Sequence, residues 1–404
     1  MESVKESRKS LRNTNFKKEV YGLKQLALLD TKSFNHAYSL VNSLPDYAQT
    51  PLIQMPRLSE LLEIGSLYCK YEGDRFGGSS FKSLGLSNAV IVAVERILTN
   101  TYKLKVELPD LTAGKYKSNT SSMTFAAATS GNHGYALAWI SSQLGAKCKI
   151  YCATDVSKNR ISRIQSLGAE VISVEGSFDR AVELCNQQSQ LHGDIVISNV
   201  VQEGFEDVPK LIMNGYGIIA KEISVQLGDA FPTHIFVGGG GGRLAASIAA
   251  FYSIETKFGS PKIIVVEPDK SDCIFQSIKH GALSTSSAQG DSFMTGLVVN
   301  KPSPIAWDIL ENNAFASITT SDEAAIEVLR AVNAGTYGDQ PIAIGETGIA
   351  AMAGLVLASR SSAIRSELEI TKESNIVVIA CEGVIDQDLL DALLAEPKIE
   401  LESL

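Results

Sequence analysis

The sequence predicts an α/β protein made of two doubly wound domains with mostly parallel sheets. Its 404 residues exceed what one hydrophobic core usually organises, so two domains are expected. Short runs rich in Val and Ile alternate with longer helical stretches. Residues 263–266 and 376–380 are apolar without alternation, which is typical of strands buried on both faces of a parallel sheet.

The predicted elements follow this pattern along the chain. Strands are expected at residues 147–154, 169–175, 195–199, 234–237, 263–267 and 375–381. Helices are expected at residues 83–97, 158–167, 178–190, 206–227 and 243–252. Residues 154–199 resemble one compact βαβ region and a second begins near residue 231, so two parallel sheets are expected.

Composition excludes several classes of partner. The formal net charge of −9 argues against nucleic acid and anionic membranes, and no apolar run is long enough to span a bilayer. Residues 1–20 mix basic and acidic side chains without an apolar segment, so a polar tail is expected instead of a secretory signal. Six scattered cysteines without a C-x-x-C pair favour reduced, buried thiols, a cytoplasmic location and no metal site.

The first segment that could carry chemistry is a loop, residues 75–81, rich in glycine and serine and followed by Lys82. Lys82 opens a predicted helix, and a lysine amine condenses with aldehydes, so it could anchor pyridoxal phosphate (PLP) covalently. A surface lysine after a loop would look the same. Ser79 and Lys82 also match the S-x-x-K motif of penicillin-recognising enzymes, but the S-D-N and K-T-G tripeptides of that family do not occur.

The second segment is Thr129-Ser-Gly-Asn-His-Gly134, which follows a run of small residues. Hydroxyls and backbone N–H groups at a turn before a helix can bind a carboxylate. An ordinary helix cap would show the same residues, and His133 could equally be a packed histidine.

The third segment places five glycines, residues 238–242, between a predicted strand and a predicted helix. Unhindered N–H groups at a helix N-terminus can bind a phosphate. Gly240-x-Gly242-x-x-Ala245 also matches a dinucleotide fingerprint, with Glu267 placed for a ribose. An NAD-dependent oxidoreductase therefore remains an alternative from this segment alone.

These three segments, in this order, resemble the PLP enzymes of the tryptophan-synthase-β type (fold type II), and more specifically the diaminopropionate ammonia-lyases. The resemblance extends from about Phe34 to Asp386. Further matching residues are Thr50-Pro-Leu52, Glu203-Gly-Phe205, Val266-Glu-Pro-Asp269, Gly296-Leu297, Trp307-Asp308, Gly345-Glu-Thr-Gly348 and Glu382-Gly383. The resemblance implies PLP in a cleft between a large PLP-binding domain (21–95 with 230–404) and a small domain (96–229), after a tail (1–20).

The resemblance also implies roles for individual residues. Lys82 corresponds to the Schiff-base lysine, Asn132 to the residue that binds the ring hydroxyl, and Cys381 to the residue facing the pyridine nitrogen. The phosphate loop corresponds to Gly239, Gly240, Gly241 and Gly242. The substrate carboxylate would be bound by Thr129, Ser130, Gly131 and His133.

Three positions depart from the family pattern. Ser130 and Asn199 stand where the ammonia-lyases carry catalytic aspartates, and neither can act as a carboxylate base. Arg243 stands where a small residue is usual. The residues expected to take part in catalysis are Lys82, as the Schiff-base lysine, and Ser130, at the position of a family catalytic residue.

The implied activity is PLP-dependent α,β-elimination by a homodimeric lyase. A small β-substituted amino acid resembling 2,3-diaminopropionate would give a 2-oxo acid and ammonia. Dehydration of L-serine or L-threonine and β-replacement remain alternatives. An NAD-dependent oxidoreductase and an inactive PLP-binding paralogue are less favoured.

Overall fold

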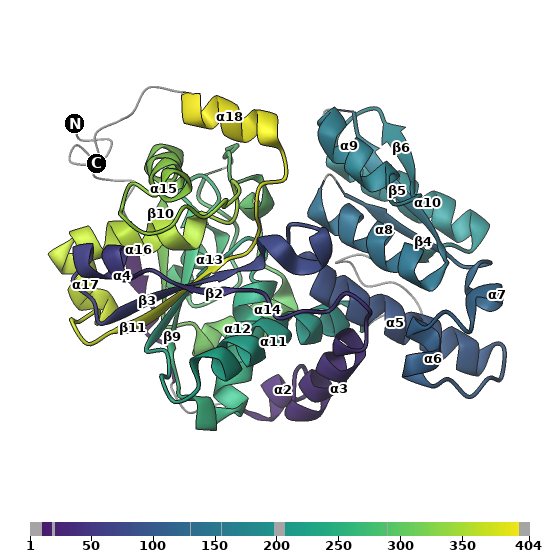
Figure 1. The fold of residues 1–404 in the computed structure, drawn as a ribbon, viewed down its shortest axis with the longest axis horizontal. Helices are drawn as coiled ribbons and strands as arrows, with labels where there is room; N and C mark the ends of the chain where they lie inside the picture. Colours follow the sequence, from purple (N-terminus) through teal and green to yellow (C-terminus); the bar gives the residue numbers. More distant parts are fainter. Residues whose placement is uncertain are drawn as a thin grey trace. The chain divides into compact units, whose positions relative to one another are not determined.

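The computed structural model describes residues 10–17, 21–129, 131–154, 156–197, 207–288 and 290–395. The chain divides into two compact units, each with its own sheet (Figure 1). The larger unit comprises Met1–Thr31, Gln49–Asp74 and Ile219–Leu404. The smaller unit comprises Lys32–Ala48 and Arg75–Ile218.

The larger unit contains a seven-stranded sheet in the order β1-β10-β9-β8-β11-β3-β2. The five central strands are parallel, and the edge strands β1 and β2 pair antiparallel with β10 and β3. The strands are β1 (Ser10–Arg12), β2 (Leu52–Gln54), β3 (Ser66–Tyr71), β8 (His234–Gly238), β9 (Lys262–Pro268), β10 (Ala316–Thr320) and β11 (Asn375–Ala380).

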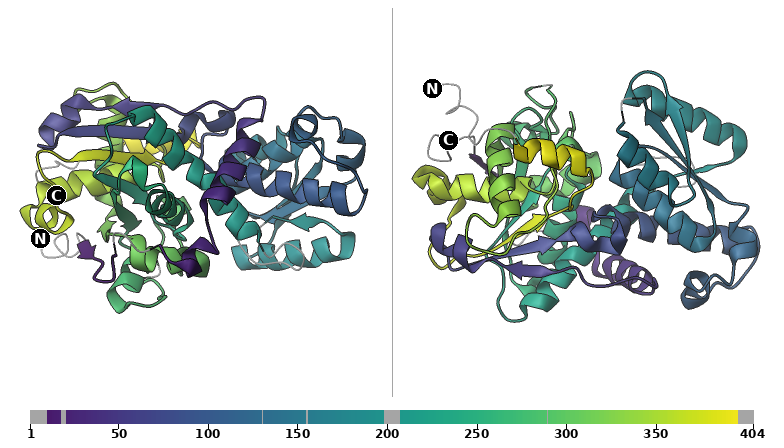
Figure 2. Two further views of the ribbon diagram at one scale, coloured as in Figure 1. Left: turned by 90° about the horizontal axis from the view of Figure 1, so that it is seen from below. Right: turned by 45° about the horizontal axis from the view of Figure 1, so that its top comes forward.

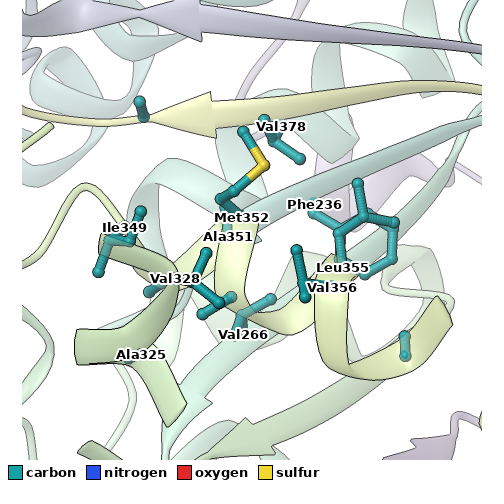
Figure 3. Packing of buried hydrophobic residues seen from close by; sticks show 14 of the residues in the cluster. Phe236, Val266, Ala325, Val328, Ile349, Ala351, Met352, Leu355, Val356 and Val378 are labelled. Carbon is teal, nitrogen blue, oxygen red and sulfur yellow. The ribbon is translucent and has the colours of Figure 1, made fainter. Parts of the chain in front are cut away.

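Helix α16 (Ala350–Arg360) forms the centre of this unit's core, because it packs on β8, β9, β10 and β11. Its side chains Met352, Leu355 and Val356 lie among Phe236 and Val266 (Figure 3). A Cβ at Gly354 would lie 2.7 Å from the Val266 side chain, so small residues let the helix approach the sheet closely. The unit's other helices are α2 (Leu23–Leu26), α4 (Pro56–Leu61), α12 (Arg243–Ile254), α13 (Cys273–His280), α14 (Pro304–Asn313), α15 (Asp322–Ala334), α17 (Ser362–Leu368) and α18 (Gln387–Ala395).

The smaller unit contains an all-parallel four-stranded sheet in the order β6-β5-β4-β7. Its strands are β4 (Thr124–Ala128), β5 (Lys147–Ala153), β6 (Glu170–Val174) and β7 (Ile195–Val196). Its helices are α3 (Thr31–Asn42), α5 (Lys82–Asn100), α6 (Leu108–Thr112), α7 (Lys117–Thr120), α8 (Asn132–Leu144), α9 (Lys158–Gln165) and α10 (Phe178–His192), while α11 (Val208–Leu227) continues into the larger unit. The strand order reverses after β6, so right-handed crossovers place α10 on the face opposite α8 and α9 (Figure 2).

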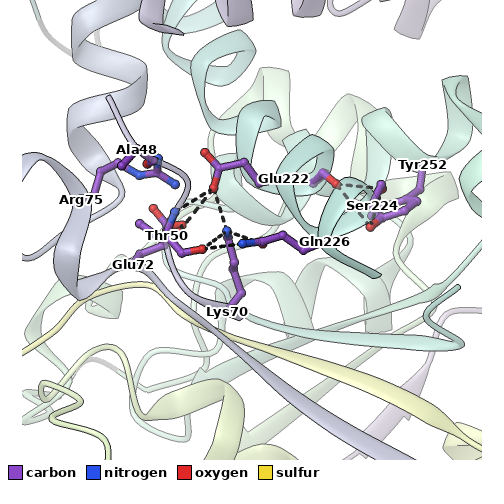
Figure 4. A network of polar contacts seen from close by, with 10 residues as sticks. Ala48, Thr50, Lys70, Glu72, Arg75, Glu222, Ser224, Gln226 and Tyr252 are labelled. Atoms are coloured by element: carbon purple, nitrogen blue, oxygen red, sulfur yellow. Dashed lines mark hydrogen bonds and ion pairs between the residues drawn. The ribbon is translucent and has the colours of Figure 1, made fainter. Parts of the chain in front are cut away.

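A buried charged network lies within the larger unit, on β3, α11 and the residues that flank β2 (Figure 4). Lys70 and Glu222 have fully buried side chains and form an ion pair of 2.7 Å. The Lys70 ammonium also donates to the Thr50 carbonyl oxygen at 2.8 Å and to Gln226 Oε1 at 2.9 Å. The Thr50 hydroxyl donates to Glu72 Oε1 at 2.6 Å. These contacts join three segments that are far apart in the sequence.

The predicted α/β class with mostly parallel sheets is confirmed. The expected strand at 195–199 is described only as Ile195–Val196, and residues 198 and 199 lie outside the described part of the chain. Five strands of the described residues were not predicted, namely β1, β2, β3, β4 and β10. Their sequences mix small or polar residues with apolar ones, so they lack the continuous apolar run that marked the predicted strands. This holds even for β10, which is buried at every position.

The unit boundaries differ from those expected from the sequence. Residues 32–48 and 75–95, expected together with 230–404, belong to the smaller unit, and residues 219–229, expected in the small domain, belong to the larger unit. For residues 75–95 the reason is that α5 packs on α8, while a Cβ at Gly85 would lie within 3 Å of Ile212 and Tyr216 in α11. Part of the expected polar tail is also ordered, because Ser10–Arg12 pairs through its backbone with β10.

Two further expectations concern the state of the cysteines and membrane-spanning segments. All six cysteines are buried, and within the described ranges none forms a disulfide. Burial raises the pKa of the Cys69 and Cys148 thiols to about 12, so these thiols stay protonated and are poor nucleophiles. In the described residues we find no helix with both the length and the apolar character required to cross a membrane.

Candidate active site

The lysine loop, residues 75–81, is a strained connection in the smaller unit that ends at helix α5. Phe76 and Ser79 have positive φ angles of 50° and 59°, which cost free energy for residues other than glycine. Arg75 is buried and its Nη1 donates to the Ala48 carbonyl oxygen at 3.0 Å. Lys82 is the first residue of α5 and is half-buried. The surrounding contacts therefore fix the start of the helix that presents Lys82.

Helix α8 holds the lysine loop in place through aromatic contacts. Phe76 stacks on Trp139 with ring centroids 4.3 Å apart. A Cβ at Gly78 would lie 2.7 Å from the Tyr135 ring, and the Tyr135 hydroxyl donates to the Gly77 carbonyl oxygen at 3.4 Å. Because α8 begins at Asn132, these contacts bring the first and second sequence segments together in one unit.

The second segment forms the turn that leads into α8. Gly131 is the N-cap residue and its N–H lies 3.4 Å from the Thr129 hydroxyl oxygen. His133 Nε2 lies 2.9 Å from the Ile197 carbonyl oxygen, so this ring nitrogen carries the proton and fixes the ring. Ser130, predicted as a catalytic and carboxylate-binding residue, lies outside the described residues.

Arg160 is a basic residue near this turn that the sequence analysis did not single out. It lies in the first turn of α9 and is half-buried. A Cβ at Gly131 would lie 3.7 Å from Arg160 Nη1. The guanidinium therefore adds positive charge beside the predicted carboxylate-binding turn. A basic residue in the first turn of a predicted helix was the available signal.

The glycine loop, residues 238–242, joins β8 to α12 in the larger unit. Gly240 and Gly242 have positive φ angles of 53° and 82°, which glycine adopts without strain. A Cβ at Gly239 would lie 2.6 Å from Glu267 Cγ, and one at Gly242 would lie 2.9 Å from Leu310 Cδ1. Three of the glycines are thus required by conformation or by packing.

The amides of the glycine loop divide into two groups. The Gly239 N–H donates to the Val266 carbonyl oxygen and the Gly242 N–H donates to the Gly239 carbonyl oxygen. Within the described part of the chain, the N–H groups of Gly240 and Gly241 have no acceptor. Since these two donors lie at the N-terminus of α12, the loop is suited to bind an anion.

Other segments singled out in the sequence meet the glycine loop in the same unit. A Cβ at Gly240 would lie 3.3 Å from the Gly296 carbonyl oxygen. The Gly296 N–H donates to the Thr347 hydroxyl at 3.1 Å, and the Thr347 N–H donates to Glu382 Oε1 at 2.9 Å. Cys381 precedes Glu382 and directly follows β11, which pairs with β8. Cys381 and the glycine loop therefore follow neighbouring parallel strands at the same edge of the sheet.

Glu267 has a structural role that removes one argument for dinucleotide binding. It is fully buried, and its carboxylate accepts hydrogen bonds from the N–H groups of Ile274 and Phe275 at 2.8 and 2.7 Å. The Ser317 hydroxyl also donates to it at 3.1 Å. The pKa of Glu267 is raised to about 8, because the effect of burial exceeds the opposite effect of these hydrogen bonds. Glu267 thus anchors α13, so it is not available to bind a ribose.

Comparison with known proteins identifies extensive similarities. A family model described as "Pyridoxal-phosphate dependent enzyme" matches residues 44–382. The diaminopropionate ammonia-lyase of Escherichia coli strain K12 is 31% identical over 346 residues, which cover 84% of this chain and 85% of that protein. The corresponding protein of Salmonella typhimurium is 29% identical and the match covers 94% and 96% of the two chains.

Solved structures agree with the sequence comparison. The crystal structure of E. coli diaminopropionate ammonia lyase in complex with an aminoacrylate-PLP azomethine reaction intermediate has a TM-score of 0.83 and 28% identity. The match covers 96% of this chain and 97% of that chain. A second structure of that enzyme, in complex with D-serine, has a TM-score of 0.84 with the same coverage. The resemblance inferred from the ordered motifs is confirmed.

Proposed function

Because the chain belongs to the family of pyridoxal-phosphate-dependent enzymes, we propose that it uses Lys82 as the covalent anchor of PLP. The reaction is α,β-elimination from a small amino acid that carries a β-leaving group, resembling 2,3-diaminopropionate. The products are a 2-oxo acid and ammonia. The observation that carries this proposal is the similarity to diaminopropionate ammonia lyase, which extends over 96% of the chain.

The residues present fit the cofactor. The N–H groups of Gly240 and Gly241 at the start of α12 suit its phosphate. Cys381, at the end of β11, offers a thiol to the pyridine nitrogen, and Asn132, at the start of α8, offers an amide to the ring hydroxyl. When bound, PLP supplies a conjugated ring that accepts the electron pair left on the α-carbon. A thiol leaves the pyridine nitrogen unprotonated, which favours elimination over transamination.

The remaining chemistry consists of carboxylate binding and proton transfer by this chain's own residues. Thr129, Ser130, Gly131 and His133 are proposed to bind the substrate carboxylate, with the Arg160 guanidinium nearby. Lys82 is proposed to remove the α-proton, since Ser130 and Asn199 cannot act as carboxylate bases. The Ser130 hydroxyl is left to assist the departing group. Asn199, like Ser130, lies outside the described residues.

We expect strict preference for one enantiomer of the substrate. One lysine approaches the α-carbon from one face, so the wild type should turn over the L-isomer and show weak or absent turnover of D-diaminopropionate. Ser130→Asp should raise activity on the D-isomer from that low baseline, because it restores a carboxylate base. The measurement is release of 2-oxo acid and ammonia from a panel of D- and L-amino acids.

The same panel separates the alternatives. Dehydration of L-serine or L-threonine is the alternative that Ser130 supports, since the serine and threonine dehydratases that this chain resembles carry serine at that position. Consumption of substrate only when a second nucleophile is added would indicate β-replacement. Inert protein that still binds PLP would indicate a non-catalytic paralogue. Equal rates of the wild type on D- and L-diaminopropionate would contradict the stereochemical argument.

The glycine loop offers a second test, in which Gly241→Ala is the informative change. Gly241 does not have a positive φ angle, and a Cβ there would meet only Arg243 Nη1, at 3.5 Å. The added methyl group should therefore leave folding intact but obstruct a bound phosphate, weakening PLP affinity by about tenfold, or ~1.4 kcal/mol. Valine at Gly242 is less informative, because it would collide with Leu310.

Gly281→Ala is the control for this test. Gly281 ends α13 with a positive φ of 63°, so alanine should lower stability by roughly 1 kcal/mol without changing PLP affinity. Apparent PLP affinity and the thermal unfolding midpoint should be measured on both variants. Unchanged affinity in Gly241→Ala would argue against phosphate binding at this loop.

Homodimerisation and a cytoplasmic location are part of the proposal. The homodimer is implied by the family resemblance, and the buried, reduced cysteines suit a reducing compartment. Light scattering of the purified protein would test the dimer.

A further inference from the structure

Arg243 occupies an unusual place, as the first residue of α12 directly after the glycine loop. The family resemblance leads one to expect a small side chain there. The Arg243 side chain is half-buried, and its Nη1 lies 3.5 Å from the position that a Cβ on Gly241 would take. The guanidinium therefore turns back toward the loop.

The backbone beneath this guanidinium is arranged to accept an anion. Gly240 and Gly241 present N–H groups that have no acceptor within the described residues. The Gly241 carbonyl points elsewhere, because it accepts a hydrogen bond from the Ser303 N–H at 3.0 Å. An anion bound to the Gly241 N–H would thus lie close to a guanidinium that stays protonated at any working pH.

We propose that Arg243 binds the cofactor phosphate directly and sets this enzyme's preference for phosphorylated over unphosphorylated cofactor. This inference rests on the proposed function, in which the glycine loop holds the phosphate. A guanidinium donates charge-assisted hydrogen bonds to phosphate oxygens, and these are stronger than the neutral hydrogen bonds of the loop amides. The charge adds to the attraction of the α12 N-terminus for a dianion.

The test compares PLP with pyridoxal, which has the same ring and aldehyde but no phosphate. Purified enzyme stripped of cofactor should be titrated with each compound, as wild type and as Arg243→Ala, Arg243→Gln and Arg243→Lys. We expect Arg243→Ala and Arg243→Gln to raise the Kd for PLP by roughly ten- to a hundredfold and to leave the Kd for pyridoxal unchanged. Arg243→Lys should be intermediate, because it retains the charge but loses the bidentate geometry.

Two further measurements separate a phosphate ligand from a structural arginine. The ³¹P resonance of bound PLP should shift in Arg243→Ala relative to wild type, and the thermal midpoint of the cofactor-free protein should not change. Arg57→Ala is the control, because Arg57 is an exposed arginine of the same unit; it should leave both Kd values at the wild-type level.

Several results would overturn the inference. They are an unchanged Kd for PLP in Arg243→Ala, an equal weakening of PLP and pyridoxal, or an unshifted ³¹P resonance. If Gly241→Ala weakens PLP binding and Arg243→Ala does not, the loop keeps its proposed role and only the role of Arg243 fails. If neither variant weakens PLP binding, the proposed phosphate site fails as well.

Discussion

Replacing Lys82 with alanine is expected to abolish covalent attachment of PLP and to lower turnover at least about a thousandfold. Lys82 is the residue at which the strained loop ends and α5 begins. Its amine has two proposed roles, as the covalent anchor and as the base that removes the α-proton. Because one substitution removes both roles, the loss should exceed that of any other single change at the site.

The covalent linkage can be followed separately from activity. Wild-type protein should be yellow and bleach with borohydride, and the reduced protein should carry the cofactor mass on the peptide that contains Lys82. Lys147→Ala, a change of an exposed lysine in the same unit, should retain colour, labelling and turnover. A Lys82→Ala protein that kept the yellow absorbance after dialysis would disprove the assignment.

The fold class could be predicted because the central strands are buried on both faces. β9 contains the continuous apolar run 263–266 and β11 the run 376–380, and such runs can be recognised in the sequence without any three-dimensional information. The start of α5 at Lys82 and the start of α12 at Arg243 lie within one residue of their predicted positions. Each follows a glycine-containing loop that marks where the preceding element ends.

Other features could not be predicted from the sequence, because they depend on contacts with residues that are far away in the sequence. β3 contains Lys70, a buried charged residue whose ammonium is bound by acceptors in other segments, Glu222 among them. The unit boundary at residue 75 depends on the packing of α5 against α8. The strand Ser10–Arg12 is held by backbone hydrogen bonds to β10, so its side chains give little sign of it.

The candidate site was predicted as segments, and its physical arrangement required the structure. The sequence offered Glu267 as a ribose ligand, but only the fold shows that its carboxylate accepts two N–H groups of α13. The Thr50-Pro-Leu segment was matched to the family without a role. The structure places Thr50 in the buried network around Lys70, which gives that motif a structural explanation.

The second large effect is expected from Lys70→Met. The Lys70 and Glu222 side chains are fully buried, so removing the ammonium leaves a carboxylate in the protein interior without the cation that pairs with it. Breaking a buried pair in this way typically costs about 3–5 kcal/mol of folding free energy. We therefore expect a loss of that size in the free energy of unfolding, measured by urea denaturation of the larger unit's transition.

The double variant Lys70→Met with Glu222→Leu should be more stable than Lys70→Met alone, since it also removes the buried charge that Lys70 balanced. Full recovery is not expected, because the Thr50 N–H also donates to Glu222 at 3.3 Å and Gln226 would lose the Lys70 donor.

Lys372→Met is the matched control. Its partner Glu63 is 3.5 Å away and both side chains are exposed, so the change should cost no more than about 1 kcal/mol. Equal losses in Lys70→Met and Lys372→Met would show that burial of the Lys70 pair does not govern its contribution. A double variant less stable than Lys70→Met would show that the loss comes from the packing of the side chains, and that the charge left on Glu222 is not its cause.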